Sequence, residues 1–253
     1  MTRFLAAVAL VLAACAADPM PPLEPSASPT QPVAERSEDV RAPGAVAELF
    51  TSEGCSSCPP ADALLSELAE RDGVIALSFH VDYWNDLGWR DPYSRDAFSE
   101  RQRAYARTLD GRVYTPQLVV DGTEGFVGSR RMQANQAINT ALSETDQVGI
   151  TLTVQPEDEG LRASYTVGSA PDEAVLHLAL VQRTGEQAVA RGENRGRTLH
   201  HTNIVRTFDT VEATSGFRVL TLPEGLSPDD VRVVAYVQEG RVGPILGATI
   251  APA

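Results

Sequence analysis

The feature that most constrains this chain is a pair of cysteines, Cys55 and Cys58, with two residues between them. The apolar run 45–50 precedes the pair, and apolar residues at helical spacing follow it over 61–68. This pattern predicts a strand, a tight turn holding both cysteines, and a helix whose first turn accommodates the two prolines after Cys58. A helix N-terminus lowers the pKa of a cysteine, and the thiolate is the form that attacks disulfides. The turn therefore indicates thiol–disulfide chemistry, with Cys55 as the more exposed, attacking thiol.

The first residues have the pattern of an export signal. Arg3 precedes the apolar run 4–12, which is too short to span a bilayer as a helix. The run ends in Leu12-Ala13-Ala14-Cys15, which resembles the lipobox of bacterial lipoproteins. The resemblance implies a signal peptide over 1–15 and lipidation of Cys15; the alternative is an ordinary secretory signal with an incidental cysteine. With Cys15 lipidated, the other two cysteines form a self-contained pair outside the cytoplasm, where disulfides persist.

The segment after the signal has the composition of a linker. Residues 16–44 are rich in proline, alanine, serine and glutamate and show no hydrophobic period, so we expect a disordered tether. The formal net charge of −13 argues against nucleic acid as a partner. We therefore expect a protein of the cell envelope, held by a lipid anchor and facing the periplasm or the exterior. Because Ala16 and not aspartate follows Cys15, the outer membrane is the expected location.

In the rest of the chain, the pattern of apolar residues changes near residue 148. Over 45–147 the predicted order is strand, helix, strand, helix, two strands and helix, which indicates an α/β domain. Over 148–253, short segments with alternating apolar residues are separated by turn signals such as Asp158-Glu159-Gly160. That pattern is typical of an all-β antiparallel sandwich. We therefore predict two separate domains.

A proline before the third predicted strand connects the α/β domain with a known fold. Tyr114-Thr115-Pro116 precedes the apolar stretch 117–120. Together with the upstream C-x-x-C, this resembles the thioredoxin-fold superfamily, in which a cis proline packs against the active-site disulfide. The resemblance implies a cis bond before Pro116, and implies that the backbone of Thr115 binds a substrate chain as an added strand. A trans turn proline is the alternative.

Longer stretches are similar to a narrower group, a bacterial secreted thioredoxin-like family without a settled function. The segments that carry this resemblance are 49–62, 80–84, 88–92, 114–122 and 192–201. The chain departs from typical thioredoxins in having Ser56-Ser57 between the cysteines and a proline after the second one. Residues between the cysteines affect the reduction potential, so the direction of electron transfer stays open.

Other polar and aromatic residues are candidates for the site. Asp82 follows the second predicted strand and is a candidate proton acceptor for Cys58; a loop cap, or an ion pair with Arg90 or Arg95, is the alternative. Trp84, with Trp89, is a candidate for a peptide-docking rim, and a hydrophobic cluster is the alternative.

A basic stretch occurs in the second predicted domain of this acidic chain. It could bind an acidic partner or the carboxylates of the first domain, and a solvated strand face is the alternative. The members of the stretch are Arg191, Arg195, Arg197, His200, His201 and Arg206. His200 and His201 should point to opposite faces of a strand.

Three functions remain possible for the cysteine pair. A copper chaperone could use Cys55 and Cys58 with His80 as a soft three-ligand site, although His80 lies in an apolar run typical of a core histidine. A binding module could keep the pair as a permanent structural disulfide. We favour a thiol–disulfide oxidoreductase without a bound cofactor, acting on protein thiols or disulfides of the envelope. In it Cys55 attacks, Cys58 resolves the mixed disulfide and Pro116 shapes the groove.

Overall fold

A computed structural model of the chain describes residues 44–109, 111–144, 148–158 and 160–253. The predicted signal peptide, Cys15 and the tether up to residue 43 lie outside the described residues. No helix within the described part is long and apolar enough to cross a membrane.

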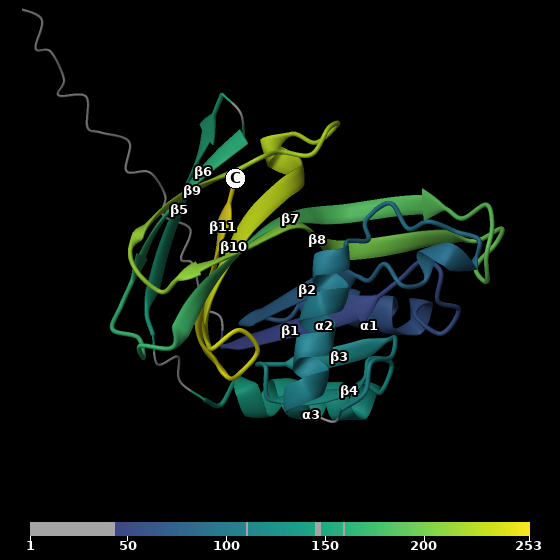
Figure 1. The fold of residues 1–253 in the computed structure, drawn as a ribbon, viewed down its shortest axis with the longest axis horizontal. Coiled ribbons are helices and arrows are strands. Elements are labelled where there is room, and N and C mark those ends of the chain that lie inside the picture. The colour runs from purple at the N-terminus through teal and green to yellow at the C-terminus, as the bar shows by residue number, and fades with distance from the viewer. Residues whose placement is uncertain (1–43, 110, 145–147, 159) are drawn as a thin grey trace, which may run out of the picture. The chain divides into compact units, whose positions relative to one another are not determined.

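Eight of the described strands form one mixed sheet with the order β11-β10-β7-β8-β2-β1-β3-β4 (Figure 1). Its members are β1 (Ala45–Thr51), β2 (Val74–His80), β3 (Gln117–Val120), β4 (Glu124–Val127), β7 (Ala174–Ala188), β8 (Thr198–Glu212), β10 (Val231–Glu239) and β11 (Ile245–Pro252). Strand β1 pairs parallel with β2 and antiparallel with β3. The two parts of the sheet meet where β8 runs parallel to β2, with Ser78 opposite Ile204.

The prediction of an α/β thioredoxin-like domain followed by a separate antiparallel sandwich is therefore wrong. The eight-stranded sheet draws its strands from both halves of the chain. The reason lies in β2, which is buried at six of its seven positions and needs a neighbour on each edge. The long β7–β8 hairpin supplies that neighbour, because both of its strands have 15 residues.

A smaller sheet covers one face of the large sheet at the end formed by β11, β10 and β7. It has the order β5-β6-β9, from β5 (Ile150–Glu157), β6 (Gly160–Val167) and β9 (Gly216–Leu220). Between the two sheets lies a core that includes Tyr165 of β6, Leu178 of β7 and Val237 of β10. The alternating segments thus form strands in two sheets packed face to face, but the larger of these sheets continues into the first half of the chain, so they are not a separate sandwich domain.

The described residues form three α-helices, α1 (Pro59–Ala69), α2 (Asp96–Thr108) and α3 (Arg131–Ala141), and two 3-10 turns, η1 (Asn85–Leu87) and η2 (Pro228–Asp230). Helices α1 and α3 pack on the face of β1 that carries Ala47 and Leu49. Helix α2 packs on the opposite face, where Phe98 and Tyr105 join residues of β7, β8 and β10 in one core. The fold therefore brings the second half of the chain into contact with both the sheet and the helix of the first half.

A buried ion pair fixes α2 against both halves. Arg101 Nε and Nη2 of α2 lie 2.9 and 3.0 Å from the Glu48 carboxylate of β1. The same Nη2 donates to Gln238 Oε1 of β10 at 2.9 Å, and Tyr236 donates its hydroxyl to Glu48 at 2.7 Å. Arg101 and Glu48 are almost completely buried, so each charge depends on these partners.

Candidate functional site

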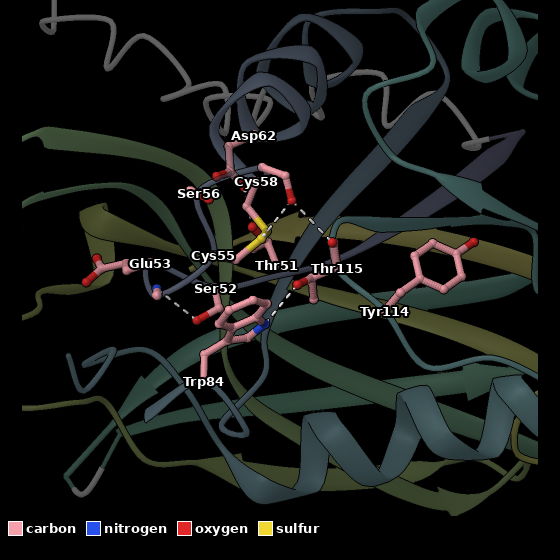
Figure 2. Close-up of a disulfide and its surroundings, with 12 residues drawn as sticks. Thr51, Ser52, Glu53, Cys55, Ser56, Cys58, Asp62, Trp84, Tyr114 and Thr115 are labelled. Atoms are coloured by element: carbon pink, nitrogen blue, oxygen red, sulfur yellow. Dashed lines mark hydrogen bonds between the residues drawn. A yellow bond between two sulfur atoms is a disulfide. The ribbon is translucent and has the colours of Figure 1, made fainter. Parts of the chain in front are cut away.

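The C-x-x-C turn lies where the sequence predicted it, between β1 and α1. Cys58 is the N-cap residue of α1, and Pro59 takes the first helical position, where no N–H is needed. Cys55 N–H donates to Ser52 O at 3.1 Å, and Cys58 N–H donates to Cys55 O at 3.2 Å. These bonds tighten the turn, and the two cysteines form a disulfide (Figure 2).

Trp84 and Thr115 lie beside the disulfide, as Figure 2 shows. Trp84 Nε1 donates to Thr115 Oγ1 at 2.9 Å, which joins the loop after β2 to the loop before β3. The Thr115–Pro116 bond is cis, which confirms that expectation. The structure therefore brings together Cys55, Cys58, Trp84 and Thr115, with Pro116 directly after Thr115 in the chain.

Gly54 shows how closely the tryptophan covers the turn. A Cβ added at Gly54 would lie 2.8 Å from the Cβ of Trp84, nearer than real Cβ atoms approach. Any other residue at position 54 would push Trp84 away from the disulfide.

Both cysteines are completely buried, with 0 % of either residue exposed. The expectation that Cys55 would be the more exposed thiol is therefore wrong for this oxidised form. Local sequence signals do not show everything that contacts the turn, because a distant segment of the sequence also bonds to it.

That segment is the loop 189–197, which joins β7 to β8. The Asn194 side-chain amide donates to Glu53 O at 2.8 Å and to Cys55 O at 3.0 Å, and Asn194 is completely buried. Next to it, Glu193 Oε2 accepts the Ser56 N–H at 3.0 Å. Hydrogen bonds from the Ser56 side chain and backbone hold the pKa of the Glu193 carboxyl below its ordinary value.

Glu53, two residues before Cys55, connects the turn to the loop 89–91 and to β8. Its buried carboxylate accepts Trp89 Nε1–H at 2.7 Å and lies 3.2 Å from His201 Nε2 of β8. Its backbone N–H donates to Asp91 Oδ2 at 2.9 Å. One residue of the basic stretch thus meets a carboxylate of the first half, as one of the two interpretations proposed. His200 is exposed and points away from its buried neighbour, as expected.

Asp62 is the acidic side chain that α1 places near the disulfide. It lies one helical turn after Cys58, and Figure 2 shows it beside that residue. Thr51 Oγ1 donates to Asp62 Oδ1 at 2.8 Å. Burial raises the pKa of Asp62 from 3.8 to about 6, against the opposing effects of the positive charge of His201 and the hydrogen bond from Thr51. A carboxyl group with this pKa can take up and release a proton near neutral pH.

Asp82, the predicted proton acceptor, is engaged elsewhere. Its carboxylate accepts a short 2.5 Å hydrogen bond from the Ser99 hydroxyl, and its backbone N–H donates to the same oxygen at 3.1 Å. These bonds tie Asp82 to α2, so the loop-cap alternative describes it. Asp62 is not among the site residues predicted from the sequence, although its spacing of four residues from Cys58 puts both on one face of the helix.

The alternative copper site is not assembled in the structure. His80 Nδ1 is bonded to Asp91 Oδ2 at 2.7 Å, and its ring packs edge-on against His201 at 4.7 Å between centroids. The sulfurs of Cys55 and Cys58 are bonded to each other. Among the described residues, no three His, Cys, Asp or Glu side chains are arranged to hold a metal ion.

Comparison with protein families places this arrangement in a known group. Residues 46–238 match the model of a family described as "Protein of unknown function (DUF1223)". The chain belongs to this family. The match to the DUF1223 family includes β1, the cysteine turn, the loop 189–197 and most of β10. No curated protein matches the chain.

Two solved structures are similar to this member of the DUF1223 family. One is the crystal structure of a protein from Agrobacterium tumefaciens, with 26% identity, a TM-score of 0.64, and coverage of 83% of this chain and 94% of that chain. The other is HBP35 of Porphyromonas gingivalis, with 17% identity, a TM-score of 0.63, and coverage of 83% of this chain and 75% of that chain. The second likeness concerns the fold alone.

Proposed function

We propose that this protein carries out thiol–disulfide exchange on proteins of the cell envelope through Cys55 and Cys58. The observation that carries the proposal is the disulfide itself, closed across the N-terminus of α1 and flanked by Trp84 and Thr115. A helix N-terminus stabilises a thiolate, which makes the reduced pair reactive. The sequence resemblance to thioredoxin-like enzymes supports the same chemistry.

The proposed exchange proceeds in two steps. In the reduced protein, the Cys55 thiolate attacks one sulfur of a substrate disulfide, forms a mixed disulfide and expels the other substrate sulfur as a thiolate. Cys58 then gives up its proton and attacks Cys55 Sγ, which releases the second substrate thiolate and closes the Cys55–Cys58 disulfide. Starting from the oxidised form, a substrate dithiol drives the same steps in reverse.

Asp62 is the proposed proton acceptor for Cys58. It lies on the helix that Cys58 begins, it is buried, and its raised pKa of about 6 lets it exchange protons near neutral pH. In the reverse direction the protonated carboxyl returns the proton to the departing Cys58 sulfur. Asp62 therefore takes the role that the sequence suggested for Asp82.

Thr115 and Trp84 are the proposed contacts for the substrate chain. They belong to two different loops that meet over the disulfide, and the hydrogen bond between their side chains is only partly buried. A substrate segment that breaks this bond would open the side of the disulfide that these two loops flank, and could pair with the backbone of Thr115.

A second candidate function is a binding module that keeps the disulfide as a permanent crosslink. The observation that favours it is the complete burial of both cysteines. Structural disulfides resist reduction, whereas exposed ones exchange more readily.

The experiment that tests exchange traps the intermediate. Reduced Cys58→Ser protein is mixed with a peptide that contains one disulfide, and the products are weighed by mass spectrometry. Exchange predicts a stable adduct through Cys55, and no adduct with the matched Cys55→Ser, Cys58→Ser double variant. A purely structural pair predicts no adduct with any variant.

We also propose that lipidated Cys15 anchors the protein in the cell envelope, a claim that rests on the sequence alone. Mature protein should partition into detergent and carry acyl groups on an N-terminal cysteine. Cys15→Ala should abolish both properties. A mature N-terminus without acyl groups would contradict the anchor.

A further inference from the structure

The proposed exchange meets a steric problem, because neither cysteine is exposed. A substrate sulfur must approach Cys55 Sγ along the S–S axis, so part of the cover must move first. Figure 1 shows β7 and β8 as two long strands whose connecting loop extends beyond β2. That loop, 189–197, contacts the turn from outside, through Asn194 and Glu193.

We propose that the loop 189–197 is a displaceable cover, which both shields the disulfide and holds Cys55 in a less reactive state. The inference rests on the proposed exchange function and adds its regulation. The cover is displaced by an extended protein segment, which takes over the contacts that the loop makes with the turn.

The loop is built to move as a unit. Its own backbone bonds run from Gly196 N–H to Val189 O at 2.8 Å, from Arg195 N–H to Gly192 O at 3.2 Å and from Arg197 N–H to Asn194 O at 3.1 Å. Arg197 also donates to Asn194 Oδ1 at 2.8 Å. These bonds stay intact when the loop leaves the turn, so displacement breaks mainly the contacts of Asn194 and Glu193.

Most of the loop is in contact with solvent rather than with the turn. Apart from Val189 and Asn194, its residues are exposed. Gly192, at φ +72°, lets the loop approach Trp89, since a Cβ there would lie 3.1 Å from the Cβ of Trp89. The loop is therefore attached through few groups: the buried Asn194 amide, the Glu193 carboxylate and the contact of Gly192 with Trp89.

Glu193 gives the cover a chemical effect besides the steric one. It occupies the N–H of Ser56, the first backbone amide after Cys55. A negative carboxylate bonded to the residue after Cys55 disfavours the Cys55 thiolate, because like charges repel. Displacement removes the carboxylate and frees the amide, so Cys55 becomes accessible and more acidic in the same event.

The test measures how fast dithiothreitol reduces the disulfide in folded protein. The variants are Asn194→Ala, Glu193→Gln and their combination; the matched controls are Arg195→Ala, an exposed residue of the same loop, and Glu224→Gln, an exposed carboxylate in a distant turn. We expect about 10-fold faster reduction for each single variant and a larger gain for the pair. Asn194→Ala removes two hydrogen bonds that hold the loop down, and Glu193→Gln replaces a charged acceptor of the Ser56 N–H with a neutral, weaker one. The two control variants should be reduced at the same rate as wild type.

Two further measurements separate the possible causes. The rates are repeated in urea below the unfolding transition, because local opening responds weakly to denaturant and global unfolding strongly. If the reduction rate of the variants rises steeply with urea, the variants are reduced through global unfolding, and the proposed role of the loop as a cover is wrong. In reduced protein, Glu193→Gln should lower the pH at which Cys55 becomes alkylated, and an unchanged pH profile would contradict the electrostatic effect.

The outcomes distinguish the cover from the proposed function. Suppose that Cys58→Ser protein with an unaltered loop forms the peptide adduct, but the disulfide of the loop variants is reduced no faster than that of the controls. Then the exchange function stands and the proposed cover is wrong. If loop variants are reduced faster but no adduct forms in any background, the loop is a shield over a structural disulfide, and the exchange function is wrong.

Discussion

Asn194 donates its side-chain amide to the backbone carbonyl of Cys55 over 3.0 Å, although 139 residues separate the two in the sequence. This bond joins the second half of the chain to the turn that carries the chemistry. Together with the contact between Glu53 and His201, it makes the β7–β8 hairpin part of the candidate site.

Asp62→Asn should change how stability depends on pH. Burial raises the pKa of Asp62 from 3.8 to about 6, so the folded protein binds this proton more tightly than the unfolded chain does. The stabilisation is fully present below about pH 4 and is lost as the pH rises through 6, which amounts to about 3 kcal/mol. The variant should therefore exceed wild type in free energy of unfolding at pH 7.5 and match it near pH 4. Urea titrations at both pH values measure this, and parallel pH profiles would contradict it.

The same substitution should slow resolution of the mixed disulfide. Without a carboxylate to accept the Cys58 proton, closure of the disulfide should be about 100-fold slower at pH 7, within the range of general base catalysis. The difference should narrow above pH 8.5, where thiols ionise unaided. Stopped-flow release of a thiol leaving group measures the step. Asp82→Asn is the control and should leave the rate unchanged, because Asp82 is bonded to Ser99; slowing by that variant instead would restore the original assignment.

Some features of the site are predictable from sequence because they are local. The two cysteines, Thr115 and Pro116 belong to short segments whose strand, turn and helix signals are clear. Trp84 is predictable as well, because it lies in the aromatic loop directly after the second predicted strand. The cis bond and the disulfide are present as expected.

The partner of β2 and the cover of the disulfide could not be predicted in this way. Alternation of apolar residues shows which face of β8 is buried, but it does not show that Ile204 lies opposite Ser78. Asn194 was part of a recognised motif, but nothing local shows that its amide reaches Cys55. Likewise, the choice between Asp62 and Asp82 depended on Ser99 of α2, whose position is set by tertiary packing.

Arg101→Met should be strongly destabilising. It leaves the Glu48 carboxylate buried without its charged partner, which costs about 3–5 kcal/mol in free energy of unfolding. Urea unfolding monitored by tryptophan fluorescence measures the loss. Arg103→Met on the same helix is the control: its pair with Glu100 is exposed, so we expect a change within about 0.5 kcal/mol. Equal effects of the two variants would contradict the role of the buried pair.

Residues 45–147 expressed alone should not fold. Phe79 of β2 packs against Phe208 of β8 with 5.3 Å between ring centroids, and Glu48 loses its bond from Tyr236 when the second half is absent. The fragment should therefore show no cooperative unfolding transition in circular dichroism, whereas residues 44–253 should show one. A cooperative transition of the fragment would mean that the first half is an independent domain after all.

Whether the Cys55–Cys58 pair exchanges can be measured by equilibrating the purified protein with glutathione redox buffers, followed by acid quenching, alkylation and mass measurement. The incubation must be long enough for the covered disulfide to react. Exchange predicts that the Cys55–Cys58 pair passes from oxidised to reduced within the range of glutathione buffers, with a midpoint above about −300 mV. A pair that stays oxidised in the most reducing buffer, while urea-unfolded protein is reduced under the same conditions, would show that the disulfide is a structural crosslink.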